Sequence, residues 1–312
     1  MIALLVLAAA TAPPALHFPV ACKLGETCAI QNYRDDDPGG AVKDYACGQR
    51  TYDGHDGTDI RLTSMALERR GVNVTAAAAG TVLRMRDGME DVSIRERAFK
   101  PGNDCGNGVI IDHGGGWETQ YCHMARGSVV VRPGQKVAAG ATLGHVGLSG
   151  NTEFPHLHIT VRQNGKAIDP FAYGQPAGQC RGGRQLWTAA IPYKAGGVLV
   201  AGFSAGPVTM KDAQDQGDRA GPRPGRATPL VAYVQAIGLE QGDVQKLTLK
   251  GPDGATLADN DVPPLDRAKA EYILFTGRKA RAGGWPAGTY RAQYQVTRGG
   301  RVVISRTFQL AL

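Results

Sequence analysis

Short runs of alternating hydrophobic and polar residues recur between positions 72 and 170, and glycine-containing turns separate them. The runs are VNVTAAAAGTVLRM, GVIIDHG, WETQYCHM, GSVVVRPGQKVAAGATLGHVG and HLHITVRQNGKAIDP. Alternation with a period of two, in segments rich in Val, Ile and Thr, is typical of half-buried β-strands. The pattern therefore predicts a compact antiparallel β architecture, with one short helix of a turn or two at Ser64–Arg70.

A second group of β-type runs follows residues 174–183, where glycines and the last cysteine predict a boundary. The runs are LWTAAIPY, GVLVAGFSA, LVAYVQAIGL, VQKLTLKGPDG, AEYILFTG, GTYRAQYQVTRGG and RVVISRTFQLAL. Seven short strands with turn signals between them favour a β-sandwich of the immunoglobulin type. The Gly-, Pro-, Arg- and Asp-rich stretch Lys211–Pro229 is predicted to be a long mobile loop inside it.

These patterns divide the chain into four parts. Residues 1–15, MIALLVLAAATAPPA, combine an apolar run with small residues suited to a signal peptidase. No Lys or Arg precedes the apolar run, so a short membrane anchor or a misplaced start stays an alternative. Residues 16–54 should form disulfide-tied loops, 55–180 a first β domain with a surface insertion at Met85–Asp104, and 185–312 the sandwich.

Composition fits two globular domains, because 42% of the 312 residues are hydrophobic and 20% are charged. The net charge of +7 comes from residues 181–312, which hold 18 basic and 10 acidic side chains, against 17 and 18 in residues 1–180. Such a surface either favours an anionic partner or is evenly solvated. The sequence holds no aromatic RNA-binding motif, zinc finger or recognition-helix pattern, so we expect no nucleic-acid partner.

All six cysteines lie in the first 180 residues, and none forms a CxxC pair. An even number of cysteines without that spacing indicates disulfides, and hence a periplasmic or extracellular location. Six cysteines permit fifteen connectivities. One pair can be predicted, because counting outward from the Gly114–Gly116 turn along a hairpin places Cys105 opposite Cys122.

Three short motifs hold the histidines that can carry chemistry: GHDGTDI, YCHM and FPHLHIT. In a strand, His156 and His158 point to the same face because they are two residues apart. His55 and Asp59 lie in a glycine-rich turn that leads into a strand, where both can approach one cation. Two histidines and one carboxylate suit zinc and leave a fourth position open.

An open zinc position lowers the pKa of bound water to about 7 and polarises a carbonyl group, which are the services that peptide-bond hydrolysis needs. His123 and His156 could then accept a proton or stabilise an oxyanion. The remaining candidates are expected to be solvated or structural: His17, His113, His145, Asp112 and Asp56. Asp56 would be the alternative ligand if Asp59 did not bind the metal.

The motifs GHDGTDI, GNGVIIDHGGGWETQYCHM, VRPGQKVAAGATLGHVGLSGN and PHLHITVRQNGKAIDP follow one another in the order found in lysostaphin-type (LytM-like) zinc endopeptidases. The resemblance covers about residues 50–173. It implies a β-sheet groove with one zinc ion on its floor, held by His55, Asp59 and His158. It also implies that His123 and His156 are the catalytic histidines.

The chain departs from that family where many members have HLHFE, because Ile159 and Thr160 replace an aromatic residue and an acid. The preceding GNTEFP also replaces a loop rich in Ser, Thr and Gly. Both changes concern the groove wall and leave the metal-centre residues intact. They leave the substrate preference within the family open.

The sequence therefore predicts an exported zinc metalloendopeptidase that cleaves peptide cross-links or stem peptides of peptidoglycan. The alternative is a catalytically silent relative that binds the cell wall or an amidase partner through the same groove. Retention of all five metal-centre residues favours the enzyme. Expected partners are peptidoglycan peptides and a protein that contacts the second domain, without stable membrane insertion once the signal is removed.

Overall fold

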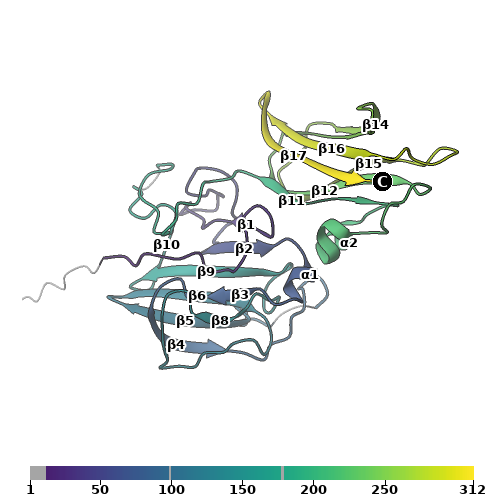
Figure 1. Ribbon diagram of the computed structural model, residues 1–312. Coiled ribbons are helices and arrows are strands. Elements are labelled where there is room, and N and C mark those ends of the chain that lie inside the picture. The colour runs from purple at the N-terminus through teal and green to yellow at the C-terminus, as the bar shows by residue number, and fades with distance from the viewer. Residues whose placement is uncertain (1–11, 98–99, 177–178) are drawn as a thin grey trace, which may run out of the picture. The chain divides into compact units, whose positions relative to one another are not determined.

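The computed structural model describes residues 12–97, 100–176 and 179–312 (Figure 1). Within these ranges it contains seventeen β-strands, two short α-helices and one 3-10 helix, so the predicted all-β class is confirmed. The predicted signal peptide, residues 1–15, falls mostly outside the described residues. Among the helices of the described ranges, none has the length and apolar character needed to cross a membrane.

Contacts divide the chain into two compact units. Unit 1 comprises residues up to Ala21, Asn73–Thr152 and Leu157–Ile191, and unit 2 comprises Cys22–Val72, Glu153–His156 and Pro192–Leu312. Both units thus combine segments that are distant in the sequence. The domain limits 55–180 and 185–312 remain predictions from the sequence.

Unit 1 is built from strands that belong mainly to one eight-stranded sheet. Its part of that sheet has the order β9-β6-β5-β4-β7, β10 pairs with β9, and β3 pairs separately with β8. The bounds are β3 Asn73–Thr75, β4 Gly80–Arg86, β5 Asn107–Gly114, β6 Trp117–Met124, β7 Lys136–Val137, β8 Thr142–His145, β9 His156–Gln163 and β10 Lys166–Ile168.

The core of unit 1 follows the alternation read from the sequence. On β5, Val109 and Ile111 are buried, and Ile159 and Val161 are buried on β9, which lies on the other side of β6. Tyr121 is fully buried on β6, and its hydroxyl accepts a hydrogen bond from the backbone N–H of Ala77 at 2.7 Å. These side chains fix which face of β6 and β9 is left for polar residues.

The predicted hairpin is present between β5 and β6. Gly114, Gly115 and Gly116 have φ values of 81°, 61° and 79°, a conformation that glycine adopts without steric cost. The predicted disulfide between Cys105 and Cys122 is also confirmed. A second disulfide joins Cys22 to Cys28, and no cysteine of the described residues is free.

Removing the hairpin disulfide should destabilise unit 1. The double variant Cys105→Ala/Cys122→Ala is expected to lose about 3 kcal/mol of unfolding free energy, because the bridge closes 17 residues and restricts the unfolded chain. Urea denaturation measures this loss. The matched variant Cys22→Ala/Cys28→Ala, whose bridge closes only 6 residues, should lose about 2 kcal/mol. An equal or smaller loss for the hairpin pair would contradict the expectation.

The segment Met85–Asp104, predicted as a surface insertion, connects β4 to β5, although Met85 and Arg86 still belong to β4. Its residues 98 and 99 lie outside the described ranges. Two of its acids are bound to neighbouring loops of unit 1. Asp87 Oδ1 accepts a hydrogen bond from Gly127 N at 2.7 Å, and Asp91 Oδ1 accepts one from Leu148 N at 2.8 Å. The insertion therefore packs on unit 1 through specific contacts.

Unit 2 begins with the antiparallel pair β1 and β2 of the eight-stranded sheet and continues into two smaller sheets, β11-β12-β15 and β14-β13-β16-β17. The bounds are β1 Cys28–Asn32, β2 Thr58–Leu62, α1 Met65–Glu68, β11 Gly197–Ser204, α2 Met210–Gln216, η1 Gly217–Arg219, β12 Leu230–Leu239, β13 Val244–Lys250, β14 Thr256–Val262, β15 Lys269–Arg278, β16 Thr289–Arg298 and β17 Arg301–Ala311.

The two smaller sheets share one hydrophobic core, which makes them the predicted sandwich. Leu230 and Leu274 come from one sheet, and Leu247, Tyr290 and Tyr294 come from the other. Each sheet thus buries the apolar face that its alternating sequence creates. The immunoglobulin type of this sandwich remains a prediction.

Two details of the second half differ from the prediction. The stretch predicted as a loop at Lys211–Pro229 contains most of α2 and all of η1, because Thr209 and Asp212 form a capping box that starts the helix. LWTAAIPY is not a strand, whereas TLADNDV forms β14. This strand was missed because its alternate positions are polar and only partly buried.

Candidate metal centre

The turn before β2 positions His55, and β2 itself carries Asp59. His55 Nδ1 lies 2.6 Å from the carbonyl oxygen of Tyr33, so this nitrogen carries the proton and donates it. His55 Nε2 lies 3.2 Å from Asp59 Oδ1, while Asp59 Oδ2 accepts a hydrogen bond from Asn32 Nδ2 at 2.8 Å. Both side chains are almost fully buried, and their orientation is fixed by these bonds.

The strand β9 begins with the HLH motif. His156 is buried, and its Nδ1 lies 2.9 Å from the carbonyl oxygen of Phe154. Its Nε2 is 3.3 Å from Asp59 Oδ1. His158 lies two residues further on, and its Nε2 is 3.0 Å from Thr160 Oγ1. An oxygen atom of the chain therefore fixes at least one ring nitrogen in each imidazole of the motif.

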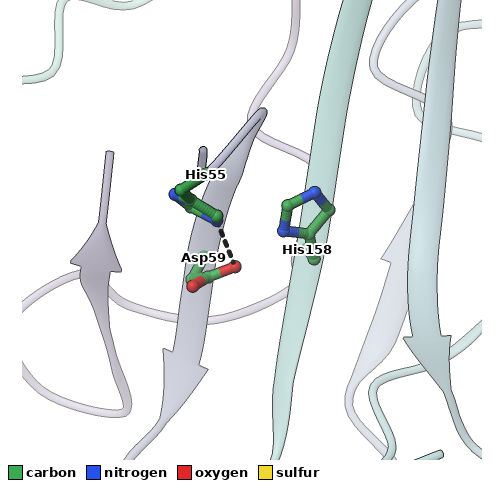
Figure 2. Close-up of side chains that lie close together, drawn as sticks. All are labelled: His55, Asp59 and His158. Atoms are coloured by element: carbon green, nitrogen blue, oxygen red, sulfur yellow. Dashed lines mark hydrogen bonds and ion pairs between the residues drawn. The ribbon is translucent and has the colours of Figure 1, made fainter. Parts of the chain in front are cut away.

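His55, Asp59 and His158 each offer one ligand atom, and these three atoms lie within 4.8 Å of one another (Figure 2). The donors suit zinc, since two neutral imidazoles and one carboxylate are borderline ligands and three protein ligands are usual in catalytic zinc sites. Tyr33 O contacts Nδ1 of His55, and Thr160 Oγ1 contacts Nε2 of His158. Such outer contacts leave His55 Nε2 and His158 Nδ1 as the nitrogens for a metal.

His123 lies at the end of β6 in a left-handed conformation, with φ of 61°. Its backbone N–H donates to Cys105 O at 2.8 Å, and its Nδ1 lies 2.8 Å from Ser149 O. The His123 and His158 ring centroids are 6.0 Å apart, with an interplanar angle of 78°. A non-glycine residue held in this conformation is a feature found at functional sites.

Two side chains contact the ligand histidines in ways that the sequence did not predict, Tyr52 at His55 and Thr160 at His158. The ring of Tyr52 lies 4.5 Å from that of His55, centroid to centroid, and desolvation together with nearby Asp59 and Asp56 raises the pKa of its hydroxyl. This hydroxyl therefore stays protonated at neutral pH. Thr160 could have been identified, because it lies two residues after His158 and hence on the same face of a strand.

Replacing Thr160 by Val should weaken zinc binding about 10- to 100-fold, the usual effect of losing a contact that orients a ligand histidine. Competition with a coloured chelator measures the affinity. Thr160→Ser keeps the hydroxyl group and should bind zinc like the unaltered chain. Equal affinities for the Val and Ser variants would show that the Thr160 hydroxyl does not orient His158.

His113 and Asp112 have the structural roles that the sequence analysis gave them. His113 Nδ1 lies 2.8 Å from Ala79 O and its Nε2 2.8 Å from Thr119 Oγ1, and burial lowers its pKa. Asp112 Oδ1 accepts a hydrogen bond from Gly114 N at 2.8 Å within the hairpin turn. Neither residue belongs to the group of three potential metal ligands.

Comparison with known proteins confirms the family resemblance for the first half of the chain. Residues 53–170 match the family model of Peptidase family M23. The DD-carboxypeptidase/endopeptidase Mpg of Neisseria meningitidis is 31% identical over 139 residues, which are 44% of this chain and 30% of Mpg. The peptidoglycan DD-endopeptidase ShyA of Vibrio cholerae is 36% identical over 64 residues, 20% of this chain and 14% of ShyA.

Among solved structures, the catalytic domain of the prophage-encoded M23 protein EnpA from Enterococcus faecalis covers 50% of this chain and 98% of its own, with 23% identity and a TM-score of 0.35. The chain spans less than a third of the length of the two curated relatives. The family match is therefore limited to residues 53–170.

Proposed function

Because residues 53–170 match peptidase family M23, we propose that the chain is an exported zinc metalloendopeptidase that hydrolyses peptide bonds in peptidoglycan cross-links or stem peptides. The observation that carries the proposal is the convergence of His55, Asp59 and His158, whose ligand atoms lie within 4.8 Å of one another. These three residues would hold one zinc ion. When bound there, the metal would supply Lewis-acid chemistry, which polarises a peptide carbonyl group and makes water nucleophilic near neutral pH.

The protein groups around the cluster have separate tasks. Tyr33 O and Thr160 Oγ1 hold the two ligand imidazoles in one orientation. Asn32 Nδ2 binds the Asp59 oxygen that does not face His55, which limits rotation of the carboxylate. A fixed ligand set keeps its geometry when a metal enters, so little reorganisation is needed.

His123 and His156 are the proposed catalytic residues. In both, Nδ1 is occupied by a backbone carbonyl group, Ser149 O for His123 and Phe154 O for His156. This bond places the proton of the neutral ring on Nδ1 and makes Nε2 the proposed base, which in His156 lies 3.3 Å from Asp59 Oδ1. Each imidazole can therefore accept a proton at Nε2 and, once charged, donate a hydrogen bond to an oxyanion.

The substrate class comes from the relatives, since Mpg is named a DD-carboxypeptidase/endopeptidase and ShyA a peptidoglycan DD-endopeptidase. Export is supported by the disulfides Cys22–Cys28 and Cys105–Cys122, which are typical of oxidising compartments. The second unit's sandwich then serves the peptidase region either as a contact surface for a protein partner or as a support.

Digestion of purified peptidoglycan tests the proposal. The zinc-loaded chain should release muropeptides with a newly cut peptide bond, which mass spectrometry identifies, and a chelator should stop the release. If the chain is instead a catalytically silent relative that binds the cell wall, it should bind zinc and sediment with peptidoglycan but release no peptide. That result would overturn the peptidase proposal.

A further inference from the structure

Arg61 lies on β2, two residues after Asp59, and its side chain is only 2% exposed. Its Nη2 lies 3.0 Å from Glu271 Oε2, and its Nη1 donates to Gln31 Oε1 at 3.3 Å. A charged guanidinium buried to this extent is costly unless a carboxylate compensates it. The position of Arg61 therefore depends on Glu271, a residue of the sandwich strand β15.

Glu271 is a fixed anchor for this guanidinium. Its Oε1 accepts a hydrogen bond from Gln214 Nε2 of α2 at 2.9 Å, and its Oε2 accepts one from Gln235 Nε2 of β12 at 3.0 Å. Side chains of α2 and β12 thus hold the carboxylate that faces Arg61. All these residues belong to unit 2.

From Arg61 the contacts lead to the catalytic region. The guanidinium carbon lies 4.1 Å from the centroid of the Phe154 ring, the distance of a cation–π contact. The Phe154 ring lies 4.9 Å from that of His156, and Phe154 O binds His156 Nδ1 at 2.9 Å. Phe154 therefore sets both the plane of the His156 ring and the nitrogen that carries its proton.

We propose that Arg61 and Glu271 are positioning residues, through which the C-terminal sandwich holds Phe154 and, by way of Phe154, the imidazole of His156. The proposal rests on the proposed function, in which His156 is catalytic. It assigns the sandwich a part in the reaction: its carboxylate completes the support of the catalytic histidine. In this proposal Arg61 and Glu271 act through Phe154 and not by contact with substrate or metal.

The test compares two ion pairs of unit 2 in the zinc-loaded full chain. Glu271→Gln removes the charge that faces Arg61. Asp243→Asn is the matched control, because Asp243 is fully buried and pairs at 2.8 Å with Arg298, a residue of β16. Both variants should lower the melting temperature. Only Glu271→Gln should lower kcat on a peptidoglycan peptide, by about 10- to 100-fold, the scale of a misplaced catalytic group, with KM and zinc content retained.

A double variant separates positioning from general destabilisation. Phe154→Leu removes the ring contact with Arg61 and His156, so it should lower kcat on a similar scale. Because Glu271 acts through Phe154, adding Glu271→Gln to Phe154→Leu should lower kcat little further. If the kcat losses of Glu271→Gln and Phe154→Leu multiply in the double variant, or if Asp243→Asn loses kcat equally, the positioning proposal is overturned. The peptidase function would be unaffected by either result.

A spectroscopic readout keeps the test independent of catalysis. The imidazole NMR signals of His156, assigned by their disappearance in His156→Ala, should shift in Glu271→Gln and stay unchanged in Asp243→Asn. Unchanged His156 signals in Glu271→Gln would refute the positioning role, whether or not the chain cuts peptidoglycan. An inactive chain whose His156 signals do shift would instead refute the proposed function alone.

Discussion

His55→Ala should remove zinc from the purified chain and reduce peptidoglycan hydrolysis to background. The imidazole supplies one of only three proposed ligands, and its Nδ1 is already fixed by Tyr33 O. With two ligands left, Asp59 would lie buried beside His156 without the charge of a metal to compensate it. Elemental analysis should find about one zinc ion per unaltered chain and close to none in the variant.

The matched control is His17→Ala, which replaces an exposed histidine outside the cluster. This variant should keep both the zinc ion and the rate of muropeptide release. Asp59→Asn and His158→Ala should behave like His55→Ala. A variant of any of the three ligands that keeps full zinc occupancy would refute the ligand assignment, and Asp56 would then be the next residue to test.

His123→Ala and His156→Ala should leave zinc bound but lower turnover on the order of 10²- to 10⁴-fold, the contribution of a general acid or base. Neither residue belongs to the group of three ligands, so the metal site persists without them. Both offer Nε2 as the base because backbone carbonyl groups occupy Nδ1. Rates of muropeptide release at saturating substrate, together with elemental analysis, measure the two effects separately.

The control for this pair is His113→Ala, which removes a histidine that is hydrogen-bonded to Ala79 and Thr119 and has no role in the proposed reaction. Its turnover should stay near that of the unaltered chain at temperatures where it is folded. Loss of zinc from His123→Ala or His156→Ala in the same proportion as loss of turnover would show that these residues are ligands.

Local sequence patterns were sufficient to predict the parts of the fold that depend on neighbouring residues. The hairpin of β5 and β6 follows from two alternating arms and three glycines, and this register alone implied the pairing of Cys105 with Cys122. The helix α1 begins after Ser64, whose side chain caps it. In each case the residues that make up the sequence pattern and the element that they form lie within about twenty positions of one another.

The parts that were missed depend on partners that no local pattern identifies. Arg61 meets Glu271 across 210 positions of sequence. The capping pair Thr209 and Asp212 was local, yet the surrounding Gly and Pro residues concealed it. For the site, motif order indicated which residues could gather, whereas the contacts that orient them, such as Tyr33 O with His55, depend on the folded backbone.

His123 directly follows Cys122, which is cross-linked to Cys105. Cys105 holds this histidine twice, through the bridge to the adjacent Cys122 and through its carbonyl oxygen, which accepts the His123 N–H. We therefore expect thiol-reducing surroundings, such as those where the chain is synthesised, to loosen the backbone that carries the proposed base. A requirement for this disulfide would keep the proposed hydrolase inactive until the chain reaches an oxidising compartment.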